Sequence, residues 1–194
     1  PSIFSTDQYA LIIHEGISTR WQHRAASALQ IVNAIYHSVI PKPGNYIVFF
    51  PSYRYMETCA ELFRRHYPAI PLHVQGAAMT PQERQAFLER FETFGEMQLH
   101  FCVLGGMFAE GIDFSGERLI GTIIIGVGLP MINPESDFVK EHFDAQGKPG
   151  YHFAYTFPGM NKVLQAMGRV IRTKKDSGII VLIDDRYLTP LYRS

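Results

Sequence analysis

The chain has 194 residues, of which 46% are hydrophobic and 19% are charged. This length suits one domain, and the composition is that of a globular protein rather than of a disordered or fibrous chain. Lysine and arginine together number 18, as do aspartate and glutamate, so the formal net charge is zero. Charge therefore does not indicate a strongly basic surface, and any contact with nucleic acid must be local or shared with another domain.

Two cysteines and eight histidines give no sign of a metal site. Two thiols are too few for a four-thiolate zinc or iron–sulfur centre within the chain. Cys59 and Cys102 each lie in an apolar run, which predicts two buried thiols. The histidines show no HExxH or clustered spacing, and no apolar stretch reaches the roughly 18 residues of a membrane span. We therefore expect no metal ligand, no iron–sulfur cluster and no membrane partner in this chain.

Short apolar runs typical of strands alternate with segments patterned as helices. In chain order, the predicted strands are residues 9–13, 46–50, 70–74, 97–104, 119–127 and 178–183. The predicted helices are one that begins near Ser18 or Thr19, then residues 53–66, 81–91, a segment opened by Asn133, and residues 161–171.

Two helix starts have recognisable signals. For the first helix, Ser18 or Thr19 is the expected N-terminal cap. Its predicted apolar face consists of Leu29, Val32, Tyr36 and Val39. Residues 80–83 (TPQE) combine a cap residue, a proline at the first helical position and a glutamate at the third, which is typical of a capping box.

The alternation of apolar strands with helices predicts the fold class. Such a pattern is typical of an α/β protein in which a mainly parallel central sheet is covered by helices on both faces, a three-layer sandwich. Ligands of these sheets bind at the carboxyl ends of the strands.

A glutamine, a glycine and two arginines stand close together near the end of the chain, in residues 165–172 (QAMGRVIR). Arg169 and Arg172 are three apart, so on a helix they share a face with Gln165 and can direct two guanidinium groups at one anion. Gly168 costs about 1 kcal/mol in a helix interior, which a close backbone approach would explain. The alternative is a surface helix with two solvated arginines.

Two further segments follow predicted strands. Glu110 and Asp113 flank Gly111 in a loop, and their chemistry fits a metal site, an acid–base pair or a solvated turn. Ser52, Tyr53 and Arg54 follow the strand at residues 46–50. Backbone amides, Ser52 and Tyr53 at this position are suited to hold a phosphate, while packing is the alternative for Tyr53.

Together these segments resemble motifs of superfamily 2 helicases of the DinG/XPD type. Residues 165–172 (QAMGRVIR) resemble the sixth motif, residues 110–116 (EGIDFSG) the fifth, and residues 49–56 (FFPSYRYM) the fourth. Residues 184–186 (DDR) resemble the D-x-R ending of that branch, and residues 16–20 (GISTR) its leading segment. The motifs occur in the family's order, and the resemblance extends over nearly the whole chain.

The resemblance implies that residues 1–194 form a single RecA-like helicase C-terminal domain, the second motor domain of an ATP-dependent DNA helicase. It implies that Arg172 is the arginine finger, that Arg169 contacts the γ-phosphate and that Gln165 senses it, with the two arginines interchangeable. The positions that would couple the ATP site to the strand are Glu110, Gly111, Asp113 and Gly168. Ser52, Tyr53 and Arg54 would bind single-stranded DNA.

The resemblance also implies the partners and cofactors. The chain has neither a phosphate-loop motif nor an acidic box. ATP and Mg²⁺ would therefore be bound mainly by a first motor domain of the same protein, which would also hold any iron–sulfur cluster. The isolated chain is expected to be inactive. The whole enzyme is expected to unwind DNA 5′ to 3′ in repair or replication, in a bacterial cytoplasm at the nucleoid.

Two other functions stay open from the residues alone. One is a non-catalytic RecA-like module that binds nucleic acid or a protein partner, although the intact Gln165, Arg169 and Arg172 argue against a degenerate helicase. An independent α/β enzyme that uses Glu110 and Asp113 as acid and base is the other alternative.

Overall fold

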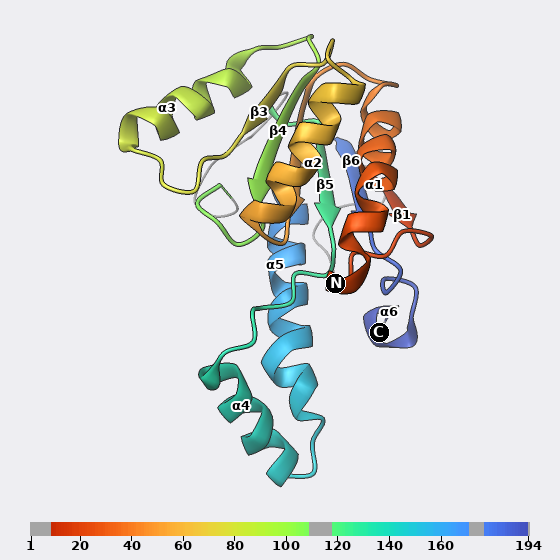
Figure 1. Ribbon diagram of the computed structural model, residues 1–194, viewed down its shortest axis with the longest axis vertical. Helices are drawn as coiled ribbons and strands as arrows, with labels where there is room; N and C mark the ends of the chain where they lie inside the picture. Colours follow the sequence, from red (N-terminus) through yellow and green to blue (C-terminus); the bar gives the residue numbers. More distant parts are fainter. Residues whose placement is uncertain (1–8, 109–117, 171–176, 194) are drawn as a thin grey trace.

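The computed structural model describes residues 9–108, 118–170 and 177–193. Within these residues, six parallel strands form one sheet in the order β1-β6-β5-β2-β4-β3 (Figure 1). The strands are β1 (Tyr9–His14), β2 (Asn45–Phe50), β3 (Leu72–Val74), β4 (Gln98–Val103), β5 (Gly121–Ile125) and β6 (Gly178–Ile183). Because every strand runs in the same direction, all their carboxyl ends lie at one edge of the sheet.

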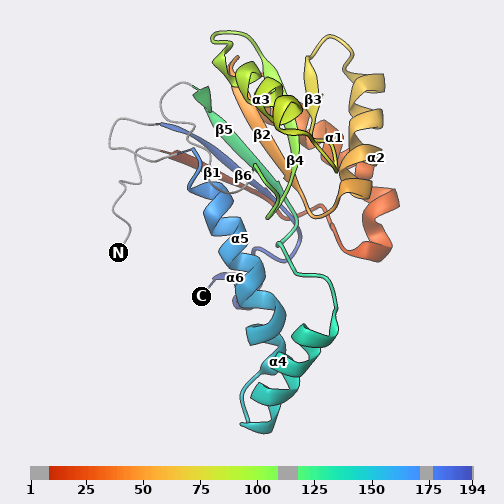
Figure 2. The same ribbon diagram turned by 90° about the vertical axis from the view of Figure 1, so that its left-hand side faces the viewer.

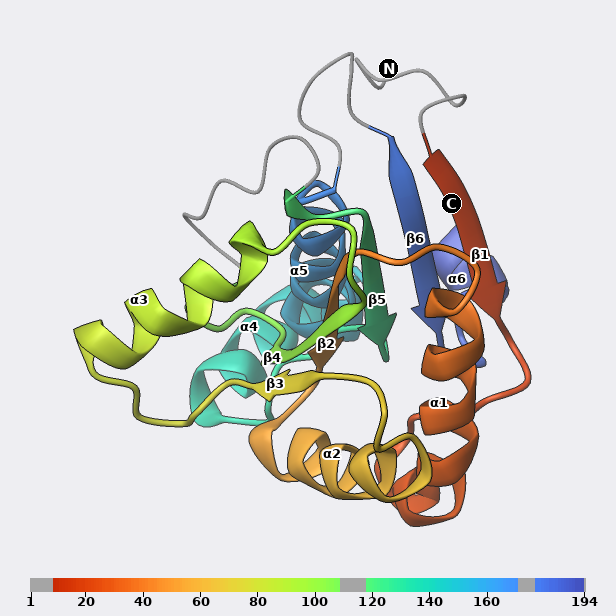
Figure 3. The ribbon, with the colours of Figure 1, turned by 90° about the horizontal axis from the view of Figure 1, so that it is seen from above.

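Helices cover both faces of this sheet. The α-helices are α1 (Arg24–Val39), α2 (Tyr53–His66), α3 (Pro81–Glu89), α4 (Pro134–Ala145), α5 (Phe157–Met167) and α6 (Pro190–Arg193). Two 3₁₀ turns, η2 (Trp21–His23) and η3 (Arg90–Glu92), and a π-helical turn, η5 (His152–Thr156), adjoin them. Helices α1 and α2 lie on one face, and α3 and α5 lie on the other (Figures 2 and 3). The predicted three-layer α/β sandwich is confirmed.

The pleat of the strands divides the core into two parts. In β2, Tyr46, Val48 and Phe50 pack toward α1 and α2, whereas Ile47 and Phe49 pack toward α3 and α5. All six residues of β2 are buried, as expected of a strand covered on both faces. The second strand of the chain is thus the centre of both cores.

The first helix begins later than the sequence predicts. Neither Ser18 nor Thr19 caps it, because the 3₁₀ turn η2 intervenes and α1 starts at Arg24 without a side-chain cap. The Thr19 hydroxyl instead donates a hydrogen bond to Asp184. The predicted apolar face is also wrong at Leu29, which is exposed. The buried side chains of this face are Ala28, Ile31, Val32, Ile35 and Val39.

The last long helix is shifted toward the amino terminus. Helix α5 begins at Phe157, directly after η5, and ends at Met167 rather than near residue 171. Gly168 is its C-terminal cap and lies in a turn that continues to Val170. Among the described residues, a Cβ on Gly168 would lie 3.5 and 3.6 Å from the Leu164 and Gln165 carbonyl oxygens, which is ordinary contact. No closer approach to Gly168 is found among the described residues, so the close approach stays a prediction.

A helical arm extends beyond the carboxyl edge of the sheet (Figures 1 and 2). We call residues 133–156 the arm: α4, the following turn and η5. Asn133 caps α4 by accepting a hydrogen bond from the Ser136 amide at 2.8 Å. No side chain of α4 is buried, and the arm is held together by pairs such as Phe143 and Phe153, whose rings stack at 4.0 Å.

Cys59 and Cys102 are buried and free, which confirms the prediction of two buried thiols. Within the described ranges, no cluster of three or more metal-ligating side chains occurs. Across the same ranges, none of the helices has the length and apolar character needed to cross a membrane.

The buried His100 of β4 makes the stability of the domain depend on pH. Its ring stacks on Phe91 at 3.6 Å, and its Nε2 lies 3.4 Å from Oδ1 of Asn45. Its Nδ1 has no hydrogen-bond partner among the described residues. Burial, with smaller contributions from His73 and Arg90, lowers the pKa of His100 to about 2. The folded domain therefore keeps this imidazole neutral.

We predict that the free energy of unfolding falls as the pH is lowered below about 6.5, the ordinary pKa of histidine. Between about pH 6.5 and the folded pKa of about 2, the unfolded chain binds a proton at His100 that the folded chain does not bind. The expected slope from His100 is up to about 1.4 kcal/mol per pH unit. Urea unfolding at several pH values measures it. His100→Phe, whose ring does not titrate, should show a shallower slope, and equal slopes would contradict this account.

Candidate functional site

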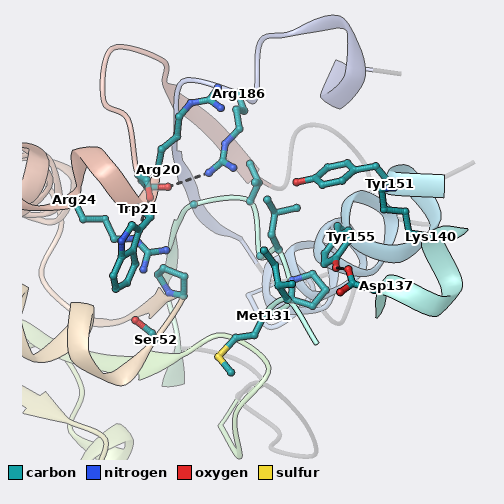
Figure 4. A pocket seen from close by; sticks show the side chains of 18 residues that line it. Arg20, Trp21, Arg24, Ser52, Met131, Asp137, Lys140, Tyr151, Tyr155 and Arg186 are labelled. Atoms are coloured by element: carbon teal, nitrogen blue, oxygen red, sulfur yellow. Dashed lines mark hydrogen bonds between the residues drawn. The ribbon is translucent and has the colours of Figure 1, made fainter. Parts of the chain in front are cut away.

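The segments that follow four strands meet at the carboxyl edge of the sheet and enclose a groove of about 590 Å³ (Figure 4). We call it the edge groove. Its lining comes from the segments after β1, β2, β5 and β6 and from the arm. The lining residues are Thr19, Arg20, Trp21, Arg24, Pro51, Ser52, residues 126–132, Asp137, Lys140, Tyr151, Tyr155 and Arg186. This volume lies within the roughly 300–1,000 Å³ typical of ligand pockets.

A cluster of the buried Thr19 and Asp184 with the largely buried Arg186 holds one wall of the groove. Arg186 donates from Nε to Asp184 Oδ1 at 2.7 Å and from Nη2 to Asp184 Oδ2 at 2.8 Å. The Thr19 hydroxyl donates to the same carboxylate. Burial raises the pKa of Asp184, but the hydrogen bonds from Arg186 and Thr19 outweigh it and hold the pKa below its ordinary value. The cluster thereby fixes the segment after β1 to the end of β6.

The end of β5 is fixed to the same cluster. The buried Tyr187 hydroxyl donates to the Gly126 carbonyl oxygen at 2.6 Å, and the Gly126 amide donates to the Ile183 carbonyl oxygen at 3.0 Å. Gly126 has a φ of 86°, and a Cβ there would lie 2.9 Å from the Thr19 hydroxyl oxygen. Only glycine meets both conditions without strain, so the floor of the groove depends on this residue.

The lining of the groove has more positively than negatively charged side chains, although the formal net charge of the whole chain is zero. Among the described residues, the cations in its lining are Arg20, Arg24, Lys140 and Arg186, against one carboxylate, Asp137. Arg186, Lys140 and Arg20 are paired, with Asp184, Asp144 and Asp185 respectively. Arg24 has no ion-pair partner among the described residues, and the side chain of Arg20 is 45% exposed, so these two cations are suited to an anionic ligand.

A shallower hollow continues the groove along α2. This side hollow, of about 410 Å³, is lined by Trp21, Gln22, Arg24, Ala25, Ser52, Arg54, Tyr55 and Thr58. It shares Trp21, Arg24 and Ser52 with the edge groove. The two form one continuous surface that crosses from the arm to α2.

Two of the three residues predicted to bind nucleic acid line this surface. Ser52 lies in both hollows and caps α2, accepting a hydrogen bond from the Tyr55 amide at 3.4 Å. Arg54 is exposed and lines the side hollow. Tyr53 lines neither, because its hydroxyl accepts a hydrogen bond from Gln75 Nε2 at 2.8 Å. Burial raises the pKa of Tyr53.

Two of the residues predicted for the ATP site, Gln165 and Arg169, lie elsewhere. Gln165 is exposed near the end of α5, and Arg169 is buried in the turn after it. The two do not share one helix, since α5 ends at Met167. The neighbouring Val170 packs at Gly178, the first residue of β6, and therefore at the amino edge of the sheet. Arg172, Glu110, Gly111 and Asp113 lie outside the described residues.

Several groove residues were not predicted as ligand contacts from the sequence. Arg20 and Arg186 belong to segments whose resemblance was noted, but no contact was assigned to them. Trp21, Arg24 and Lys140 were missed altogether. The one available signal is the single tryptophan of the chain between two arginines at positions 20 and 24.

Comparison with solved structures defines the class of this domain. Two chains of XPD helicases match it, and the one with the TM-score of 0.75 is 18% identical, with 96% of this chain and 38% of that chain covered. Domain 2 of the DEAD-box helicase Mss116p, solved on an RNA duplex, matches at a TM-score of 0.56 and 16% identity, covering 96% and 57%. These similarities show a RecA-like α/β fold.

Comparison of sequences defines the family. The matching family model is the helicase C-terminal domain, over residues 35–194. The chain belongs to this family, in its XPD-like branch of superfamily 2, as the motifs predicted.

Two relatives illustrate the branch. A probable ATP-dependent helicase of Methanocaldococcus jannaschii is 30% identical over 158 residues, 74% of this chain and 24% of that protein. The XPD helicase subunit of the general transcription and DNA repair factor IIH of Saccharomyces cerevisiae is 30% identical over 156 residues, 75% of this chain and 20% of that protein. The chain thus spans about a fifth to a quarter of the length of these relatives.

We predict that Asp184→Ala lowers the free energy of unfolding by roughly 3–5 kcal/mol, because it removes the bidentate partner of the Arg186 guanidinium, whose side chain is 15% exposed, and leaves only the longer contact with Asp185 at 4.0 Å as an ion pair among the described residues. Asp185→Ala is the matched control. It breaks a partly exposed pair with Arg20 at 3.3 Å and removes a longer one with Arg186 at 4.0 Å, and it should cost less than about 1 kcal/mol. Urea unfolding of both variants measures the difference. Equal losses would show that the buried cluster does not hold this edge of the sheet.

Proposed function

We propose that the chain is the second motor domain of an ATP-dependent DNA helicase and that it holds single-stranded DNA along the edge groove. The observation that supports this most is the gathering of Arg20, Arg24, Lys140 and Arg186 at the carboxyl edge of a chain without net charge. A phosphate backbone is the ligand best suited to a groove lined by several cations. The names of the relatives, which are helicases, support the same function.

The second half of the proposal concerns ATP. Hydrolysis requires that charge on the transferring phosphoryl group be stabilised, and the first motor domain would supply the phosphate loop and Mg²⁺. In this proposal Arg172 is the arginine finger, Arg169 contacts or orients the γ-phosphate and Gln165 senses it. The exposed Gln165 at the end of α5 fits a role toward a ligand held by another domain. The isolated chain would not turn over ATP.

Helix α5 offers a physical connection between the two halves. The continuous run from η5 to α5 begins beside the edge groove, which Tyr151 and Tyr155 line, and ends at Gly168 and Arg169. At 1.5 Å per residue, such a run spans on the order of 20 Å. The residues that would couple the ATP site to the bound DNA are Glu110, Gly111, Asp113 and Gly168. Movement in the 5′-to-3′ direction is proposed from the resemblance alone.

We predict that Arg172→Ala, in a protein that includes the first motor domain, lowers ATP turnover by about 10³-fold or more and leaves single-strand binding nearly unchanged. The reason is that an arginine finger acts mainly on the transition state. Arg172→Lys keeps the charge but loses the planar fork, so it should restore little. Phosphate release and strand affinity are measured on the same preparations.

Lys174→Ala is the control for simple loss of a positive charge. If Arg172→Ala hydrolyses ATP like the unaltered protein, Arg172 is not the finger and Arg169→Ala becomes the decisive variant. If both arginine variants retain full turnover while the strand still binds, the chain is a nucleic-acid-binding module without a part in catalysis.

A further inference from the structure

One large aromatic ring of the edge groove stands open to solvent. Trp21, the single tryptophan of the chain, is 74% exposed and belongs to the 3₁₀ turn η2 that precedes α1. It lines both the edge groove and the side hollow, so it lies where the two meet. Exposure of an indole costs hydrophobic free energy that burial elsewhere would have avoided, so its position needs an explanation.

The ring is supported from one side by Arg24. The guanidinium carbon of Arg24 lies 5.4 Å from the centre of the Trp21 ring and 5.0 Å from the centre of the Tyr55 ring. Its Nε donates to the Thr19 carbonyl oxygen at 3.1 Å, which ties the support to the buried cluster. Because Trp21 remains mostly exposed despite this contact, the indole presents its other side to solvent. The indole therefore has one side against Arg24 and an accessible π-face on the other.

The surroundings of the ring suit a nucleotide. Arg20 and Arg186 lie beside Trp21 and Arg24 in the groove, and Tyr151, Tyr155 and Lys140 lie across from them (Figure 4). Arg20 is paired with Asp185 at 3.3 Å, but its side chain is 45% exposed, so part of the guanidinium is accessible to a phosphate. A ligand with a planar aromatic part and an anionic part matches both the open indole and the cations around it.

We propose that Trp21 is a stacking platform for one unpaired base of the bound strand, with Arg24 as the positioning residue that holds the indole. This proposal deepens the proposed function and rests on it, since the strand must lie in the edge groove for a base to reach Trp21. Stacking on an indole requires an exposed base face, so the site takes single strands and not an intact duplex. It is tolerant of sequence because every base has a π-face.

Intrinsic fluorescence tests the proposal directly, because Trp21 is the single tryptophan of the 194-residue chain. The chain is titrated at low salt with oligothymidylate, with an abasic oligomer of equal phosphate count and with a blunt duplex. Fluorescence anisotropy of end-labelled oligomers reports binding independently. We expect oligothymidylate to quench the Trp21 emission at saturation, whereas the abasic oligomer and the duplex should bind through their phosphates without that quenching.

Three variants separate stacking from charge and from folding. Trp21→Ala should weaken oligothymidylate binding about ten-fold or more and leave abasic binding nearly unchanged. Trp21→Phe retains a ring and should restore part of the loss. Phe94→Ala is the matched control, because Phe94 is also an exposed aromatic residue, at 50%. It follows Thr93, whose carbonyl oxygen accepts a hydrogen bond from Asn45 at the amino end of β2, the edge opposite the groove. This variant should therefore bind every oligomer like the unaltered chain. Unfolding curves of all variants exclude a folding defect.

The outcomes distinguish the two proposals. Two results would overturn the stacking site: oligothymidylate binds without quenching, or Trp21→Ala loses oligothymidylate and abasic binding equally. Either result would leave the proposal that single-stranded DNA binds in the edge groove unaffected. Absence of binding by every oligomer at low salt contradicts the strand-binding half of the proposed function and the stacking site with it. Equal quenching by the duplex would show that Trp21 senses phosphate contact rather than a base.

Discussion

The buried contact of Arg186 with Asp184, shared with Thr19, is the interaction on which the functional edge of this domain depends. It joins two segments that are 165 residues apart, the one after β1 and the one after β6. A buried charged pair offers little net stability, but removing one partner is costly, so it fixes geometry more than it adds free energy. Here it positions the turn that presents Arg20, Trp21 and Arg24 to the groove.

The all-parallel sheet separates the two proposed activities. Every strand ends at the same edge, which is where the cations and the open indole gather. The turn with Arg169 lies by the amino edge, where Val170 packs at Gly178. The run from η5 to α5 spans this distance and has groove residues at one end and Arg169 after the other. In the proposed function, this run would link contact with DNA to contact with the nucleotide.

The fold was largely predictable, and the groove was not. Apolar runs bounded by turn residues define each strand locally, so all six predicted strands occur, and β6 spans the predicted residues. The errors arose where distant contacts decide local structure. Thr19 is a good cap by type, but it donates to Asp184, and the helix starts at Arg24 instead. Gly168 was expected inside a helix, but it ends one. The groove forms where the segments after four β-strands come together in the folded chain. A pattern within one segment of the sequence does not predict that arrangement.

The central claim is that single-stranded DNA binds at the carboxyl edge of the sheet. Amide hydrogen exchange of the chain with and without saturating oligothymidylate tests it most directly, because it reports every segment at once. The account predicts slower exchange in residues 15–24, 51–58 and 126–132, with no change in residues 37–42 at the amino edge. Protection confined to the amino edge or to α3, with those three segments unchanged, would contradict it.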